Sequence, residues 1–124
     1  MCGISGIYAL DSETGPPPLD AVERMTEALR HRGPDDGGTW EHAACTLGMR
    51  RLSIIDLDTG RQPMLNEDAS VVLVYNGELY NYRPLRAELS AAGIAARTDS
   101  DTEVVLAAWR HWGADCLARF NGMF

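Results

Sequence analysis

The 124-residue chain contains no lysine, so all 11 of its basic residues are arginines, against 18 aspartates and glutamates. The resulting formal net charge of −7 excludes a protein that binds nucleic acid through a basic surface, because such a surface must neutralise phosphates. No apolar run approaches the roughly 20 residues of a membrane-spanning helix. The N-terminal residues also lack the basic segment and apolar run of a secretory signal. We therefore expect a cytoplasmic protein that binds neither nucleic acid nor membrane.

Cysteine is scarce, and its placement limits the chemistry. Cys2, Cys45 and Cys116 are odd in number and far apart, which argues against a disulfide framework and against a structural zinc site. His42 and Cys45 supply only two ligands, so we expect no metal site. Cys45 and Cys116 have apolar neighbours and are expected to be small buried residues. Cys2 differs, because the adjacent Gly3 leaves the backbone free to approach a ligand.

The helical patterns are clear. Apolar residues at three- and four-residue spacing predict amphipathic helices over residues 19–30 and 84–92, and Gly93 suits the position after the second helix. Ser100 and Glu103 have the spacing of a capping box, which predicts that a third helix begins there.

The strand patterns complete an α+β domain. Strands are predicted over residues 2–10 and 71–75, and the apolar residues of 46–49 and 52–57 predict one or two further strands. The near-continuous apolar run 71–75 is typical of a strand buried on both faces. Strands and helices in this mixed order favour a layered α+β domain over a bundle or a barrel. Met123 and Phe124 look like the beginning of another strand, so we expect the domain to be incomplete at this end.

Cys2 is a candidate nucleophile. If Met1 is removed, Cys2 carries both a thiol and a free α-amine, whose unperturbed pKa is about 7.7 to 8.0. The neutral amine can then accept the thiol proton, directly or through one water, so that a single residue supplies nucleophile and base. The alternative is an ordinary cysteine at position two, because reactivity requires a suitable environment.

Asn76 and Gly77 follow the apolar run directly. The Asn76 side-chain amide and the Gly77 backbone N–H are two donors that can converge on a developing oxyanion. The alternative is a hairpin turn, since Asn-Gly is the strongest short signal for one. The polar residues Glu78 and Asn81 beyond it argue against a simple return strand.

A guanidinium and a carboxylate could hold the two charged ends of a free amino acid. Arg51 stands where the apolar residues resume, and it can grip a carboxylate through two hydrogen bonds. The alternative is a surface arginine, as we expect for Arg50. Asp101 or Glu78 would face the amino group, although the helix dipole alone also explains Asp101 in a first turn.

Five ordered motifs resemble the N-terminal glutaminase domain of asparagine synthetases. This group belongs to the class II glutamine amidotransferases, which have the N-terminal-nucleophile hydrolase fold. The motifs are Met1-Cys2-Gly3-Ile4-Ser5-Gly6, His31-Arg32-Gly33-Pro34-Asp35, Arg51-Leu52-Ser53-Ile54-Ile55-Asp56, Tyr75-Asn76-Gly77-Glu78-Leu79-Tyr80-Asn81 and Ser100-Asp101-Thr102-Glu103.

The resemblance implies a role for each candidate residue. Cys2, once Met1 is gone, would attack the side-chain amide of glutamine, with Asn76 and Gly77 stabilising the oxyanion. Ammonia would leave, and water would hydrolyse the γ-glutamyl thioester to glutamate. Arg51 would hold the substrate α-carboxylate. The remaining substrate contacts implied are the backbone of Leu52, Ser53, Ile54 and Ile55, and the carboxylates of Glu78 and Asp101 at the α-amino group.

The resemblance also implies a larger context. The fold would be a four-layer αββα sandwich lacking its C-terminal part, with residues 1–124 forming a truncated glutaminase domain. Ammonia would pass to a C-terminal synthetase domain or subunit. ATP and magnesium are expected only in that absent domain, so we expect no cofactor in this chain.

Several alternatives stay open on the sequence. The ammonia acceptor, formation of a homodimer and removal of Met1 are undecided. Exposed sheet edges lead us to expect that the isolated chain aggregates and lacks activity. The chain could instead be a non-catalytic glutamine-binding or structural domain, or a half-domain that works only beside a complementary chain.

Overall fold

The computed structural model describes residues 2–11, 15–52 and 60–124. The chain divides into two compact units, each described here by itself. Unit 1 takes its residues from Met1–Ser53, Arg61–Pro63 and Val74–Asn76, and unit 2 from Ile54–Gly60, Met64–Leu73 and Gly77–Phe124. Strands and helices occur in both units, which confirms the α+β class.

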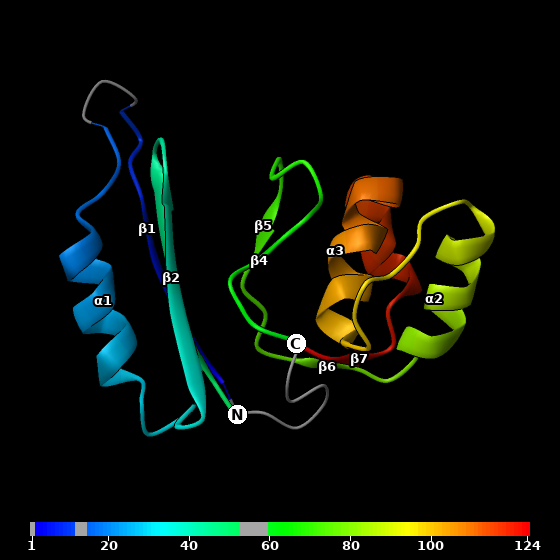
Figure 1. Ribbon diagram of the computed structural model, residues 1–124, viewed down its shortest axis with the longest axis horizontal. Helices are drawn as coiled ribbons and strands as arrows, with labels where there is room; N and C mark the ends of the chain where they lie inside the picture. The colour runs from blue at the N-terminus through cyan, green and yellow to red at the C-terminus, as the bar shows by residue number, and fades with distance from the viewer. Residues whose placement is uncertain (1, 12–14, 53–59) are drawn as a thin grey trace. The chain divides into compact units, whose positions relative to one another are not determined.

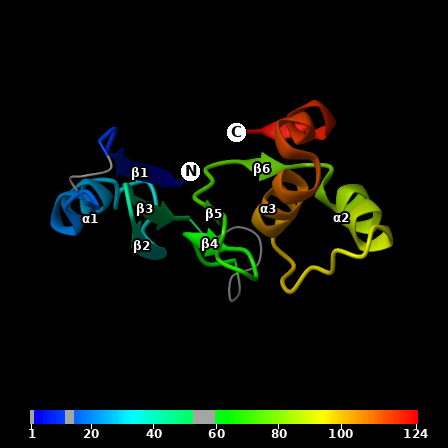
Figure 2. The same ribbon diagram turned by 90° about the horizontal axis from the view of Figure 1, so that it is seen from above.

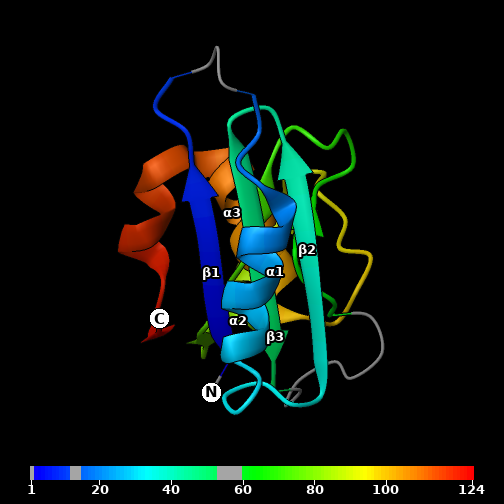
Figure 3. The same cartoon turned by 90° about the vertical axis from the view of Figure 1, so that its left-hand side faces the viewer.

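Unit 1 is a three-stranded antiparallel sheet covered by a helix. Strands β1 (Gly3–Tyr8), β2 (Asp36–His42) and β3 (Cys45–Arg51) lie in the order β1-β3-β2. Helix α1 (Leu19–Ala28) packs across one face of this sheet against all three strands, as Figure 3 shows. The first predicted strand and the first predicted helix are thus confirmed, with shorter ends.

The helix of unit 1 approaches the sheet closely. Val22 on the helix and Met49 on β3 are completely buried. Gly48 allows this contact, because a Cβ atom there would overlap the Thr26 hydroxyl. That hydroxyl donates to the Val22 carbonyl at 2.7 Å and lies 2.8 Å from the Ser5 hydroxyl on β1. Apolar packing and the hydroxyl contact between Thr26 and Ser5 therefore hold α1 against the sheet.

Unit 2 is built around helix α3 (Asp101–Trp112). It packs between helix α2 (Tyr82–Ala91) and a two-stranded hairpin of β4 (Met64–Leu65) and β5 (Val72–Leu73), as Figure 1 shows. The chain then forms the 3-10 helix η2 (Gly113–Arg119). Six buried apolar residues of this unit form one cluster: Leu79, Leu85, Leu89, Val104, Ala108 and Cys116.

A second two-stranded sheet joins distant parts of unit 2. Strand β6 (Glu78–Leu79) pairs antiparallel with β7 (Gly122–Met123), and β6 runs beside α3 in Figure 2. The expected strand near Met123 is confirmed. Since β5 pairs with β4 and β6 pairs with β7, the hairpin interpretation of Asn76 and Gly77 is wrong.

The helix-end signals are confirmed except for one. Gly93 follows α2 with φ of 87°, a backbone conformation that favours glycine. The Ser100 side chain caps α3 by accepting from the Thr102 N–H at 3.2 Å. The reciprocal half of the capping box does not form, because the Glu103 carboxylate instead accepts hydrogen bonds from Arg97 and Thr98.

Two other expectations need correction. The strand expected over 71–75 is limited to Val72–Leu73, and residues 71–74 are only half-buried, because a two-stranded hairpin is covered on one face. Cys116 is buried as expected, whereas Cys45 is half-buried; all three cysteines are free thiols. The strand expected over 52–57 falls largely outside the described residues.

Among the described residues, no helix has the length and apolar character that crossing a membrane requires.

The core of unit 2 gives a stability prediction. Leu89 is 2% exposed in the apolar cluster, whereas Leu117 is 54% exposed. Leu89→Ala is expected to lower the free energy of unfolding by about 2 to 5 kcal/mol through lost burial and a residual cavity. Leu117→Ala, the matched control, should change it by less than about 0.5 kcal/mol. Urea denaturation measures both, and equal effects would contradict the packing described.

Candidate functional site

Cys2 lies at the end of the sheet in unit 1, directly before β1. Strand β1 pairs with β3 so that Gly3 faces Arg50, and this register brings Cys2 to the residue that follows β3. The Leu52 N–H donates to the Cys2 sulfur at 3.4 Å, and the sulfur lies 3.7 Å from the Leu52 carbonyl oxygen. The half-buried thiol therefore contacts polar backbone.

The loop after α1 holds the backbone of Cys2. The Arg32 Nε atom donates to the Cys2 carbonyl oxygen at 3.0 Å. Arg50 fixes the same loop by donating to the Gly33 and Pro34 carbonyl oxygens at 2.9 and 3.3 Å. Gly33 is required, because a Cβ atom there would overlap the backbone of Arg50. Arg50 is thus not the simple surface arginine expected from the sequence.

Sequence reasoning missed the contact of Arg32 with Cys2. The motif that contains Arg32 supported the resemblance, but its spacing indicated only a polar turn. The available signal was the alternation of glycines and apolar residues on the two predicted strands. From this pattern, the start of the first strand could have been paired with residues near 50. That pairing would have placed the loop that contains Arg32 beside Cys2.

Arg51 is the last residue of β3 and is 5% exposed, so the surface-arginine alternative is wrong. It faces Asp36 in the β2–β3 register, and its carbonyl oxygen accepts from the Asp35 N–H at 3.1 Å. Leu52, which contacts the thiol, is the next residue in the chain. The structure therefore brings a buried guanidinium group into the segment that touches Cys2.

Asn76 ends the last segment of unit 1, and Gly77 begins the last segment of unit 2. The preceding Tyr75 is buried, and its N–H donates to the Gln62 side-chain oxygen at 2.6 Å. The residue before the two candidate oxyanion donors is therefore held by a buried hydrogen bond.

Asp101 and the segment after Gly77 come together in unit 2. Asp101 is the first residue of α3 and is 6% exposed. Its Oδ2 atom accepts from the Leu79 N–H at 2.9 Å, which fixes β6 against the start of the helix. Glu78 is half-buried in β6. The helix dipole favours a carboxylate here, and the bond to Leu79 adds a second structural role for Asp101.

The remaining predicted pocket residues divide in two. Leu52 is half-buried and contacts Cys2 through its backbone. Ser53, Ile54 and Ile55 lie outside the described residues.

Glu103 is the most heavily hydrogen-bonded carboxylate described. It is 6% exposed, and it accepts from the Arg97 N–H, the Thr98 N–H and the Thr98 hydroxyl at 2.7 to 3.0 Å. Burial raises the pKa of Glu103, but the hydrogen bonds from Arg97 and Thr98 outweigh it and hold the pKa below its ordinary value of 4.5.

The lowered pKa of Glu103 predicts a pH-dependent stability. A carboxylate whose pKa is lower in the folded state stabilises fully above its unfolded pKa, and this contribution disappears as the pH falls through the folded pKa. Glu103→Gln should therefore lower the Tm near pH 7, with the difference from the wild type shrinking well below pH 4.5. Thermal unfolding from neutral to acid pH measures this difference. A difference independent of pH would contradict it.

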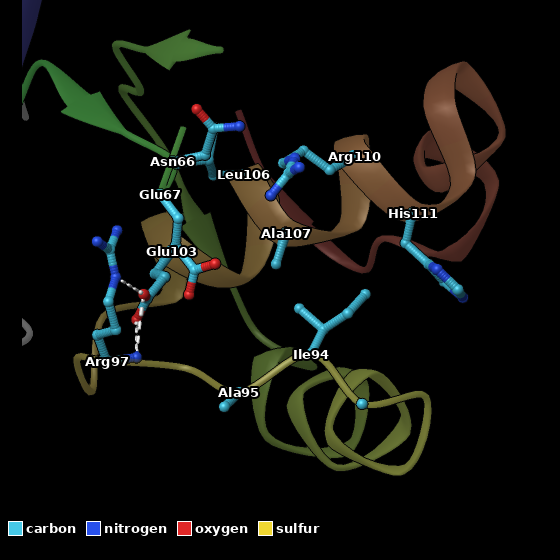
Figure 4. Close-up of a pocket in the computed structure, with 11 residues that line it drawn as sticks. Asn66, Glu67, Ile94, Ala95, Arg97, Glu103, Leu106, Ala107, Arg110 and His111 are labelled. Atoms are coloured by element: carbon cyan, nitrogen blue, oxygen red, sulfur yellow. Dashed lines mark hydrogen bonds and ion pairs between the residues drawn. The ribbon is translucent and has the colours of Figure 1, made fainter. Parts of the chain in front are cut away.

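A pocket of about 280 Å³ opens beside α3 in unit 2 (Figure 4). Its apolar floor includes Leu106 and Ala107. Both arginines among its lining residues form ion pairs, Arg97 with Glu103 at 3.3 Å and Arg110 with Asp68 at 3.2 Å. Within residues 2–11, 15–52 and 60–124, no cluster of three His, Cys, Asp or Glu side chains could hold a metal ion.

Comparison with known proteins defines the family. The glutamine amidotransferase domain model matches residues 1–124. The chain belongs to this family of glutamine amidotransferase domains, and the resemblance drawn from its motifs is confirmed.

The relatives are glutamine-hydrolysing asparagine synthetases. The chain is 40% identical over 131 residues to asparagine synthetase 1 of Bacillus subtilis, covering 100% of the chain and 20% of the relative. It is 41% identical over 139 residues to a putative asparagine synthetase of Mycobacterium tuberculosis, covering 100% of the chain and 21% of the relative. It is 38% identical over 124 residues to the enzyme of Asparagus officinalis, covering 100% of the chain and 20% of the relative. The chain thus spans about a fifth of the length of these relatives.

Proposed function

We propose that this chain hydrolyses glutamine to glutamate and ammonia in the cytoplasm, as the glutaminase part of a longer asparagine-synthetase-type enzyme. Family membership supports the glutamine amidotransferase class. The observation that carries the proposal is the contact of the Cys2 thiol with the backbone of Leu52, the residue after the buried Arg51.

The first half of the proposed reaction forms a thioester. After Met1 is removed, the thiol proton of Cys2 moves to the α-amine of the same residue, and the sulfur bonds to the side-chain amide carbon of glutamine. The carbonyl oxygen becomes an oxyanion, which the Asn76 amide and the Gly77 N–H stabilise. The α-ammonium group then returns its proton to the amide nitrogen, the carbonyl re-forms, and the C–N bond breaks to release ammonia and leave the γ-glutamyl thioester.

The second half releases glutamate. The neutral α-amine takes a proton from water, and the hydroxide oxygen bonds to the thioester carbon. The C–S bond breaks, and the sulfur regains its proton. Because the α-amine acts in both halves, a single base suffices, and Arg32 keeps it in place by binding the carbonyl of the same residue.

The substrate is proposed to be held by its charged ends. Arg51 would bind the α-carboxylate through two parallel hydrogen bonds. Glu78 and Asp101 would face the α-amino group, with backbone from 52–55 completing the pocket. A buried guanidinium suits this role, because a charge-assisted hydrogen bond is stronger away from water.

The larger enzyme completes the proposal. We propose that the two units belong to an αββα sandwich of the N-terminal-nucleophile hydrolase type. Ammonia would pass to a synthetase domain that uses ATP and magnesium to activate a carboxylate acceptor. The relatives, five times longer than the region they share with this chain, support a further domain of this kind.

The direct test is an assay of the full-length protein with glutamine labelled with ¹⁵N in its side-chain amide. Release of glutamate together with transfer of the label to an amidated product is the expected result. Glutamine binding without glutamate release would favour a non-catalytic binding domain and would contradict the proposal. Glutamate release that appears only after a second chain is added would favour the half-domain alternative.

A further inference from the structure

We propose that Glu103 is a positioning residue that holds Asp101 in place for the substrate amino group. This inference rests on the proposed function, because it assigns Glu103 a role through the substrate contact of Asp101. Glu103 itself is not expected to touch glutamine, since its carboxylate is directed to the loop before α3.

The carboxylate of Glu103 organises the loop that leads into α3. It binds the backbone N–H groups of Arg97 and Thr98 at 2.7 to 3.0 Å. It also accepts from the Thr98 hydroxyl at 2.8 Å, and that hydroxyl oxygen accepts from the Ser100 N–H at 3.3 Å. One buried carboxylate thus fixes, directly or through Thr98, the backbone just before Asp101.

Two further contacts hold the same loop from α2. Arg86 donates to the Ser100 carbonyl oxygen at 3.1 Å and to the Asp99 carboxylate at 2.9 Å. Asp99 is almost fully exposed, so its ion pair contributes little. Glu103 is the buried carboxylate of this network, whereas Asp99 is exposed, so the loss of the Glu103 carboxylate should matter most.

The consequence for the site is carried by the bond between Asp101 and Leu79. The Leu79 N–H donates to Asp101 Oδ2 at 2.9 Å, which leaves Oδ1 as the oxygen to meet an ammonium group. Leu79 lies two residues after Gly77. If the loop before α3 shifts, Asp101 shifts with it, and the support of this segment weakens.

The test uses the full-length protein with Glu103→Gln, which keeps the size of the side chain but turns one acceptor into a donor. The KM for glutamine should rise about ten- to hundredfold, as expected for a lost hydrogen bond to a charged group, while kcat stays within about threefold. Glu67→Gln is the matched control, because exposed Glu67 lines the same pocket and undergoes the same chemical change. It should leave KM unchanged.

Coupling to Asp101 separates positioning from general stability. In an Asp101→Ala background, Glu103→Gln should change KM by less than about threefold, because the group that it positions is gone. If Glu103→Gln raises the KM by the same factor in the Asp101→Ala background as in the wild type, the proposal is overturned. If Glu103→Gln does not fold, Thr98→Val removes one of its donors more gently and should show the same dependence on Asp101.

Amide hydrogen exchange gives a readout that needs no activity. The Leu79 N–H should exchange faster in Glu103→Gln but not in Glu67→Gln, since its bond to Asp101 is weakened. Unchanged exchange at Leu79 would overturn the proposal. Absence of glutaminase activity in the wild type would overturn the proposed function and this role with it. If the wild type is active but Glu103→Gln and Asp101→Ala change the KM independently of each other, the role of Glu103 alone is overturned.

Discussion

Cys2→Ala in the full-length protein is expected to abolish glutamine hydrolysis, while synthesis fed by free ammonia continues. Removing the nucleophile removes the covalent route entirely, and losses on the order of 10⁴-fold or more follow in enzymes of this kind. Glutamate release and ammonia-dependent product formation, measured on the same preparation, separate the two reactions. The backbone contacts of residue 2 with Arg32 do not need the thiol, so the fold should be preserved.

Cys45→Ala is the matched control for Cys2→Ala. Cys45 is a free, half-buried thiol at the far end of β3 and has no place in the proposed chemistry. It should retain glutaminase activity within about twofold. Equal loss of the glutamine and ammonia reactions in Cys2→Ala would show a structural role for Cys2 and would contradict the mechanism.

Arg51→Lys is expected to lower kcat/KM for glutamine by about 30- to 1,000-fold, chiefly through KM. A lysine keeps the charge but cannot form two parallel hydrogen bonds with a carboxylate, so the substitution is not conservative at such a site. Steady-state kinetics with glutamine measures the effect.

Arg61→Lys provides the control for Arg51→Lys, because the Arg61 side chain is 82% exposed. It should leave kcat/KM unchanged. A glutamine analogue without the α-carboxylate sharpens the test, since wild type and Arg51→Lys should process it equally poorly. A variant that discriminates between glutamine and this analogue as strongly as the wild type would argue against the clamp.

The elements with strong local signals were predictable. The helices follow from apolar spacing and from the glycine and serine at their ends, which act over a few residues. The pairing of β6 with β7 could not be predicted, because it joins Glu78–Leu79 to Gly122–Met123, which are far apart in the sequence. Likewise, Glu103 has the spacing of a capping box, but its carboxylate accepts hydrogen bonds from N–H groups of the preceding loop instead of from the helix N-terminus.

The residue types of the candidate site could be predicted from the sequence. The contacts that hold these residues in place could not. Cys2, Arg51 and Asp101 could be named because each carries a functional group suited to glutamine. The roles of Arg32 and Arg50 depend on tertiary contacts, because the β1–β3 register and the loop after α1 together place Cys2, Gly33 and the two guanidinium groups. A motif shows which groups are present, whereas strand register decides which of them meet.

The most direct measurement is mass spectrometry of the full-length protein mixed with glutamine and quenched in acid within its first turnovers. Digestion should yield an N-terminal peptide that begins at Cys2, and a fraction of it should carry one added γ-glutamyl group that hydroxylamine removes. Retention of Met1 in active protein, or a γ-glutamyl group on any other residue, would contradict an N-terminal cysteine nucleophile.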